Sequence, residues 1–504
     1  MESSQKKGGV VLSYIMLISN IIVKFIYTPF LLKNIGQEEY GLYSLVITIV
    51  GYLTLLDLGF GSAIVRFTIK YKNDENKHKL HEIYGMMSLI YLIIGIIALL
   101  ISFSIYANVD NLFEKSMTEV EMSKMKIMIL LSGFNLLFSF PLQIASSVLI
   151  AYEKFIFRNG ANLIKILIVP LFMVLCIILF DFKSVGLILI VTAFNLITYL
   201  SYYIYAYKKL DFRLSFIKID RILLKSIIGF SSSVFLLMIH EQVQLHSGQF
   251  ILGIFKGTKD VAVWGIAMIF VLNYRSISTA ITNVFTPSIV SKVFDDDQTY
   301  INQSIFKFVR IQTYVLLITL LNFVLFGLDF LILWAGEEYK AAYEVSLIIM
   351  IPMTFALLLD FAYIIQIAKN SFRFRIITFF SSFFLSFTLL LLIFEITLKS
   401  YSIMISFSII IGQIILMIYY IIKYIKFDLI KVLKNISQIS FFPLLYYLIF
   451  YIVFISRDIF SSIESNVFKL IFTVAIFNCG LIIIYWFLCF SKEEKQMLFK
   501  LKRL

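Results

Sequence analysis

Charged residues, proline and glycine are all scarce in this sequence. Asp, Glu, Lys and Arg make up 15% of the 504 residues, against about 25% in soluble domains. With 6 prolines and 21 glycines, the chain is neither collagen-like nor a low-complexity disordered segment. The longest connection between apolar stretches, residues 108–126, is too short for a domain. We therefore expect no soluble domain.

The 3 cysteines and 4 histidines offer little material for a metal site. All three cysteines lie in apolar stretches without metal-ligand spacing, which favours buried apolar packing. His240 and His246 are six residues apart and lie on different faces of a helix. We expect no metal and no organic cofactor.

Apolar residues dominate instead, at 60% of the chain with 17% aromatics. Their runs are continuous rather than alternating, which excludes a membrane β-barrel. The content suffices for about 14 spans of about 21 residues. We predict an all-α polytopic membrane protein with spans near residues 10–33, 41–65, 83–107, 127–150, 160–180, 185–206, 226–254, 261–286, 309–334, 342–367, 375–395, 400–422, 438–456 and 466–490.

Lys and Arg residues are unevenly divided between the two sides of these spans. Of the 44, 30 fall on the side of the termini, 11 on the opposite side and three inside spans. Because cytoplasmic loops retain positive charge, this bias predicts that both termini are cytoplasmic. It also explains the net charge of +13 without a nucleic-acid partner.

The first predicted span carries a cation on a polar helical face. Lys24 lies near mid-depth, on the same face as Asn20. An ionisable residue at this depth costs about 2.5–3.5 kcal/mol or more, so it is a candidate for function. The alternative is that Lys24 extends toward the interface or pairs with a structural neighbour.

The eighth predicted span repeats this design, since Arg275 shares a face with Thr279 and Thr282. A guanidinium suits phosphate. Alternatively, the hydroxyl groups on this helical face could form a helix–helix contact. Lys165 in the fifth span is a third candidate cation, and it lies close enough to the cytoplasmic side to extend toward the interface.

Four residues in the spans are candidates for coupling or gating. Glu241, with His240 beside it, could bind or relay a proton or sodium ion, or neutralise a nearby cation. Asp57 could form a gate or a static ion pair with Arg66, and Asp360 lies at a comparable depth.

Two neighbouring segments resemble a known signature. Residues 36–44 (GQEEYGLYS) and 56–66 (LDLGFGSAIVR) are similar to the N-terminal signature of Wzx-type polysaccharide flippases. These belong to the multidrug/oligosaccharidyl-lipid/polysaccharide exporter superfamily. The resemblance is most specific over residues 8–70. It extends loosely over the whole chain through residues 261–267 and 336–343. Within the chain, residues 36–43 are also weakly repeated at 257–265 and 336–339.

The resemblance implies two six-helix lobes forming a V around a central cavity, with alternating access. The lobes would be residues 1–210 and 211–430. Residues 431–504 would form two further helices, which provide a groove for a lipid tail, and a basic tail.

The implied substrate is an oligosaccharide on undecaprenyl diphosphate, moved from the cytoplasmic to the outer leaflet of the bacterial inner membrane. Cavity cations of related flippases match Lys24, Arg66 and Arg275 by position. The expected partners are this lipid, the phospholipid bilayer and other polysaccharide-assembly proteins, such as a polymerase or a chain-length regulator. The protein is expected to be a monomer, not an enzyme.

Two other functions compete with this interpretation. A drug/cation antiporter of the same superfamily would have twelve spans and an acidic cavity. A membrane polymerase or glycosyltransferase would need a larger outer loop than residues 108–126, which contain no His or Arg.

Overall fold

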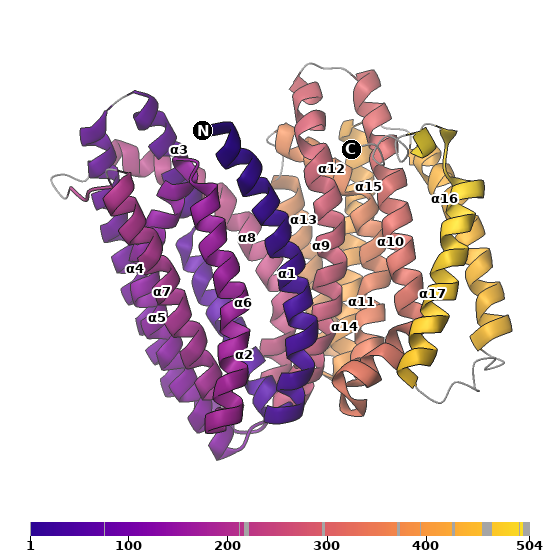
Figure 1. Cartoon of the computed structure of the whole chain (residues 1–504), viewed down its shortest axis with the longest axis horizontal. Coiled ribbons are helices and arrows are strands. Elements are labelled where there is room, and N and C mark those ends of the chain that lie inside the picture. Colours follow the sequence, from indigo (N-terminus) through magenta and orange to yellow (C-terminus); the bar gives the residue numbers. More distant parts are fainter. Residues whose placement is uncertain are drawn as a thin grey trace. The chain divides into compact units, whose positions relative to one another are not determined.

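In the computed structural model, every regular element of the described residues is a helix. The structure describes residues 2–74, 76–210, 212–215, 221–294, 298–369, 373–393, 395–425, 429–455, 466–492 and 494–496. Figure 1 shows long helices, several of which are interrupted by short 3₁₀ or π segments. The prediction of an all-α fold is confirmed.

The chain divides into two compact units, Met1–Gly265 and Ile266–Leu504. The predicted division near residues 210 and 430 into helical lobes stays a prediction. The helices of the first unit are α1 (Glu2–Ile35), α2 (Gln37–Thr54), η1 (Leu55–Asp57), α3 (Phe60–Asn73), α4 (Lys77–Phe113), α5 (Glu119–Ala151), α6 (Phe155–Phe180), α7 (Ser184–Lys209), α8 (Arg221–Phe255) and the start of α9 (Thr258–Phe294).

The second unit contains the rest of α9 and the remaining helices. These are α10 (Gln298–Ala335), η2 (Glu337–Tyr339), α11 (Ala341–Leu358), α12 (Asp360–Ala368), α13 (Arg373–Ile393), α14 (Leu398–Ser408), η3 (Ile409–Ile415), α15 (Leu416–Tyr420), η4 (Ile421–Ile425), α16 (Leu429–Phe450), η5 (Tyr451–Ile455), α17 (Asn466–Ile484) and η6 (Tyr485–Cys489).

The number of spans agrees closely with the prediction of about 14. Thirteen helical stretches in the described residues are long and apolar enough to cross a membrane. The remaining predicted span, 226–254, falls within α8, which is 35 residues long and is not among the thirteen. Many side chains of α8 lie outside the described part of the structure, so this predicted span stays a prediction.

The core of the first unit lies between α4, α5 and α7, which run side by side (Figure 1). Tyr84, Tyr91 and Phe140 are buried here, and the rings of Tyr91 and Phe140 stack with centroids 6.1 Å apart. At the start of α5, Thr118 and Glu121 form a capping box, which satisfies otherwise unpaired N–H groups. The long helices thus begin at defined residues and pack on aromatic side chains.

The weak sequence repeat has a structural basis in three glycines. Gly36, Gly257 and Gly336 have φ values of 85°, 89° and 111°. Each lies directly before a helical segment, α2, α9 or η2. Because side chains strongly disfavour such backbone angles, glycine is required at these turns.

The core of the second unit consists of several smaller clusters. One is formed by α9, α10, α12 and the α15–η4 segment, with Phe308 and Phe361 fully buried. Another joins α10 to α16 and α17 through Phe326, Phe450 and Phe477. α16 and α17, the predicted extra pair, are therefore packed on α10 by aromatic side chains.

Candidate functional site

Lys24 is exposed near the middle of the first membrane span. The span is Val11–Ile35, which places Lys24 about 20 Å from its start and about 17 Å from its end at 1.5 Å per residue. Lys24 forms no hydrogen bond or ion pair with any residue that the structure describes. Asn20 is half-buried one turn earlier. The ammonium group therefore lacks compensation from the described part of the protein.

The rest of α1 is held against α6 by polar contacts. Asn159 donates to the Ser13 hydroxyl at 3.0 Å and to the Gly9 carbonyl at 3.1 Å. The Tyr27 hydroxyl donates to the Met173 sulfur at 2.8 Å. These contacts fix the helix that carries Lys24.

The other two predicted cations of the first unit differ from Lys24. Lys165 on α6 is half-buried and donates to Oδ1 of Asn195 on α7 at 3.1 Å. Arg66 is exposed on α3. Lys165 therefore has a structural contact within the bundle, and the predicted substrate role of each residue stays a prediction.

The second membrane span is broken at Asp57. α2 ends at Thr54, the 3₁₀ turn η1 follows, and Leu58 and Gly59 have φ values of 52° and 75° before α3 begins. Asp57 is buried and accepts hydrogen bonds from the backbone N–H groups of Gly59 and Gly61. The Tyr91 hydroxyl donates to its Oδ1 at 2.5 Å. A buried carboxylate thus covers the start of α3, where the helix dipole favours negative charge.

On α9, the hydroxyl side chains near Arg275 lie in two different environments, one buried and one exposed. Ser278 is fully buried and accepts a hydrogen bond from Gln312 on α10, and Thr282 is buried nearby. Thr279 is exposed, and its hydroxyl donates to the Arg275 carbonyl at 3.0 Å. The buried hydroxyl of Ser278 therefore makes a helix–helix contact, whereas Arg275 and Thr279 lie on a more open side of α9.

Asp360 lies in a cluster of charges in the second unit, at the break between α11 and α12. Nη2 of Arg375 is 3.7 Å from its Oδ1, and Arg275 also interacts with it electrostatically. The Arg375 guanidinium is 4.1 Å from the ring centroid of Tyr363. The structure thus brings Asp360 together with the predicted cation Arg275, and adds Arg375 near the start of α13.

Glu241 and His240 lie within α8, but their side chains are outside the described part of the structure. Lys24, Asp57, Arg66 and Lys165 belong to the first unit, whereas Arg275 and Asp360 belong to the second. Each group is therefore described within its own unit. Among the described residues, no three His, Cys, Asp or Glu side chains come together to hold a metal ion.

A polar cluster that sequence reasoning missed surrounds Arg310 on α10. Its Nε and Nη2 donate to the two carboxylate oxygens of Glu494, both at 2.8 Å, and its Nη1 donates to Asn435 on α16 at 2.9 Å. The backbone N–H of Ser491 also donates to Glu494. Burial alone raises the pKa of Glu494, but these hydrogen bonds outweigh it and hold the pKa below its ordinary value. The sequence signal that could have pointed to Glu494 is the Ser-x-x-Glu capping pattern at residues 491–494.

A cavity of about 500 Å³ with a mixed polar and apolar lining adjoins Arg310 between α16 and η6. Ile439, Phe441, Phe442 and Leu488 form much of its wall. The cavity therefore combines one cation with hydrocarbon surface, next to the predicted extra helix pair.

Comparison with known proteins places the chain in a family. The family model described as "Polysaccharide biosynthesis protein" matches residues 6–293. No curated protein sequence matches the chain.

The fold is similar to that of solved transport proteins. Against the lipid II flippase MurJ in an inward closed conformation, the TM-score is 0.70 at 14% identity, covering 94% of this chain and 99% of that one. An inward-facing multidrug resistance MATE family transporter of the MOP superfamily gives 0.59 at 14% identity, covering 85% and 98%. A mutant of the Vibrio cholerae MATE transporter VcmN gives 0.57 at 13% identity, covering 84% and 97%. The chain therefore belongs to the polysaccharide biosynthesis protein family and has the fold of the MOP superfamily, as the sequence resemblance predicted.

Proposed function

We propose that this protein flips an oligosaccharide linked to undecaprenyl diphosphate from the cytoplasmic to the outer leaflet of a bacterial inner membrane. The observation that carries the proposal is Lys24, an exposed cation at mid-span without a described partner. Family membership supports a role in polysaccharide assembly. The similar fold of a lipid II flippase supports a lipid-linked substrate.

The physical problem is that a diphosphate cannot cross hydrocarbon unaided. An ammonium facing lipid at the depth of Lys24 is costly, whereas one facing a water-filled path can bind an anion in transit. Arg275 is the corresponding candidate in the second unit, with Thr279 beside it for sugar hydroxyls. Asp360 partly offsets the charge of Arg275, which favours release as well as binding.

The lipid tail needs an apolar path while the headgroup is inside the protein. The cavity beside α16, with walls of Phe441, Phe442 and Leu488, provides surface of that kind. The step is a relocation without covalent chemistry, so the proposal needs no nucleophile or catalytic base. The excess of Lys and Arg on one side orients the protein with both termini in the cytoplasm.

The decisive experiment measures on which leaflet the substrate accumulates. The gene is deleted, and the lipid-linked oligosaccharide is assayed in membrane vesicles of known orientation. We expect accumulation on the cytoplasmic face, reversed by the wild-type protein. Lys24→Gln should fail to reverse it, whereas Lys33→Gln, near the end of the same helix, should restore transport.

Three results would contradict the proposal. Accumulation on the outer face would instead indicate a polymerase or glycosyltransferase. No accumulation would favour a drug/cation antiporter, whose fold is also similar. Full transport by Lys24→Gln, at normal protein levels, would remove the diphosphate contact from Lys24.

We further propose that a proton or sodium gradient drives transport through a carboxylate in a span. Asp57 and Asp360 are the described candidates, because each is enclosed at a helix break. Transport in reconstituted vesicles would be measured with each gradient imposed separately. Asp57→Asn or Asp360→Asn should abolish the response to the driving ion, and an unchanged response in both variants would exclude them.

A further inference from the structure

A basic pocket lies at one end of the first unit. Its volume is about 510 Å³, within the range of small-molecule sites. The ends of five helices contribute to it: α1, α3, α4, α6 with the turn before it, and α7. All of these ends lie on the side that the Lys and Arg bias predicts to be cytoplasmic.

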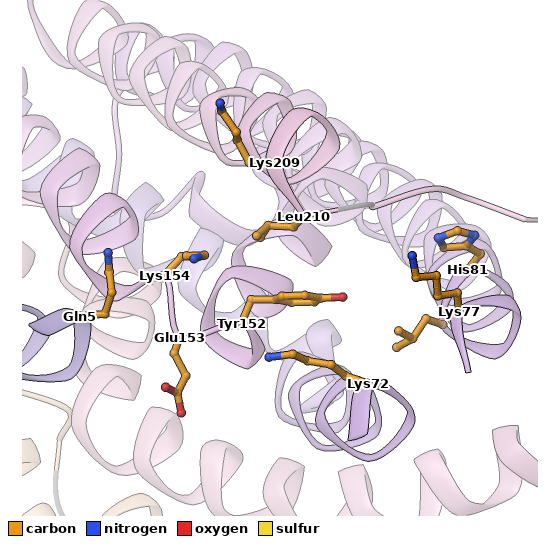
Figure 2. Close-up of a pocket in the computed structure, with 10 residues that line it drawn as sticks. Gln5, Lys72, Lys77, His81, Tyr152, Glu153, Lys154, Lys209 and Leu210 are labelled. Carbon is orange, nitrogen blue, oxygen red and sulfur yellow. The ribbon is translucent and has the colours of Figure 1, made fainter. Parts of the chain in front are cut away.

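Lysine is the commonest residue type in the lining of this pocket. Four lysines line it together with His81, and Glu153 is the carboxylate among the lining residues. In Figure 2, the Glu153 carboxylate and the Lys209 ammonium both point away from the ring of Tyr152, whereas the Lys72 ammonium lies beside this ring. The four lysines are Lys72, Lys77, Lys154 and Lys209.

Two of these lysines lack a compensating charge in the described part of the chain. Lys154 and Lys209 form no ion pair with any described residue. Lys72 lies 4.6 Å from the ring centroid of Tyr152, which orients its ammonium without neutralising it. The pocket therefore concentrates positive charge in a concave space, where the field is stronger than on an open surface.

The backbone adds to this field. α4 begins at Lys77 and α6 begins at Phe155, so the N-terminal ends of two long helices lie at the pocket. Helix N-termini favour anions. Two donors are already used, because the backbone N–H of Ile156 donates to Gln5 at 3.4 Å and that of Lys79 donates to the Asn76 side chain at 3.0 Å. The Lys154 side chain forms no capping hydrogen bond.

A general cytoplasmic excess of positive charge does not account for this arrangement. Lys70 and Lys208 lie on the same helices as Lys72 and Lys209, yet neither lines the pocket. A bias that only orients the protein requires charge on the correct side, not convergence on one cavity.

We propose that this pocket binds a phosphate-bearing anion at the cytoplasmic end of the first unit. Several lysines around a cavity of this size suit a diphosphate or the phosphate of an anionic lipid headgroup. The apolar lining by Leu80 and Leu210 is compatible with either source. The bound group bridges five helix ends and stabilises the unit. This site is independent of the transported substrate proposed above.

The first arm of the test uses inorganic pyrophosphate and the purified full-length protein in a non-ionic detergent. Calorimetry compares the wild type, the pocket variant Lys72→Gln/Lys154→Gln, and the control variant Lys70→Gln/Lys208→Gln. The two variants lose the same charge, and Lys70 also lies over a tyrosine ring, at 5.3 Å from the centroid of Tyr71. We expect the pocket variant to lose at least about tenfold in affinity, because each charged hydrogen bond contributes about 1.5–3 kcal/mol.

The second arm distinguishes a lipid headgroup from a soluble phosphate. The same proteins are placed in nanodiscs of phosphatidylcholine, with or without phosphatidylglycerol, and their melting temperatures are compared. Stabilisation by phosphatidylglycerol that only the pocket variant loses assigns the site to lipid. Pyrophosphate binding without this lipid effect assigns it to a soluble phosphate.

Two outcomes overturn the proposal. Equal weakening of both variants would indicate diffuse surface charge rather than a site. No pyrophosphate binding and no lipid effect would exclude a phosphate site altogether. If the pocket variant does not fold, Lys154→Gln alone replaces it in both arms. Because these readouts are binding and stability, a failed transport assay leaves them unaffected, and the reverse also holds.

Discussion

The substitution Gly41→Ala is predicted to destabilise the first unit strongly. Gly41 lies on α2, where this helix crosses the beginning of α9. A β-carbon at position 41 would lie 1.9 Å from the carbonyl oxygen of Thr258 and 2.7 Å from its carbonyl carbon. Thr258 is also held by its hydroxyl, which donates to Glu121 at 2.6 Å. The atoms that the β-carbon would meet are therefore backbone atoms, which cannot rotate aside as a flexible side chain could.

The expected magnitude follows from this distance. Real β-carbons essentially never approach closer than 3.0 Å, so the 1.9 Å contact requires a shift of about 1.1 Å between two helix backbones. Overpacking of a core costs about 1–3 kcal/mol and sometimes more. At about 2–4 °C per kcal/mol for a domain of 150–250 residues, the melting temperature should fall by at least about 2 °C.

The assay is thermal unfolding of the purified protein in detergent, with Gly160→Ala as the matched control. Gly160 lies within α6, and a β-carbon there would have no atom within 4 Å. Alanine is favoured over glycine in a helix by about 0.5–1 kcal/mol, so the control should melt at the wild-type temperature or above. A Gly41→Ala protein that melts like the control would refute the packing argument. A confirmed loss of stability would mean that Gly41, which lies in the signature at residues 36–44, is needed for helix packing and not for substrate binding.

Three further predictions concern polar contacts. Glu494→Gln should lower the melting temperature at neutral pH by breaking the paired contact with Arg310. Because the pKa of Glu494 is lowered on folding, the stabilisation is present above its unfolded pKa and is lost as pH falls through the folded pKa; a wild-type advantage that persists at pH 2 would contradict this. Asn322→Leu should cost about 1 kcal/mol, since it removes the two hydrogen bonds that join Asn322 to Asn478 on α17; unfolding in detergent measures this, and no change would dismiss the contact. Tyr91→Phe should cost about 1.5–3 kcal/mol, because the buried carboxylate of Asp57 loses its side-chain donor and keeps only the N–H groups of Gly59 and Gly61; a melting temperature equal to that of wild type would contradict this.

Hydropathy was sufficient to predict the membrane helices because each span must satisfy a length and an apolarity requirement on its own. The predicted span 185–206 is α7 (Ser184–Lys209), and 160–180 lies within α6 (Phe155–Phe180).

The breaks within spans could not be predicted in the same way. The sequence around Asp57 contains two glycines, which permit a bend, but the break also places Leu58 at a positive φ. That conformation is disfavoured for leucine and is held by tertiary packing. Similarly, the ion pair of Arg310 could not be predicted, because its partner Glu494 is distant in the sequence and only the fold brings the two together.

The three cations within predicted spans show which features of the site can be predicted from the sequence and which cannot. Composition identifies Lys24, Lys165 and Arg275 equally, as charges in apolar stretches. The structure separates them: Lys165 donates to Asn195, and Arg275 interacts with an aspartate of its own unit. Lys24 has no such partner among the described residues. A charge that the protein does not compensate must be compensated by water or by a ligand. Of the predicted residues of the first unit, Lys24 is therefore the one whose loss should most directly affect an anionic substrate.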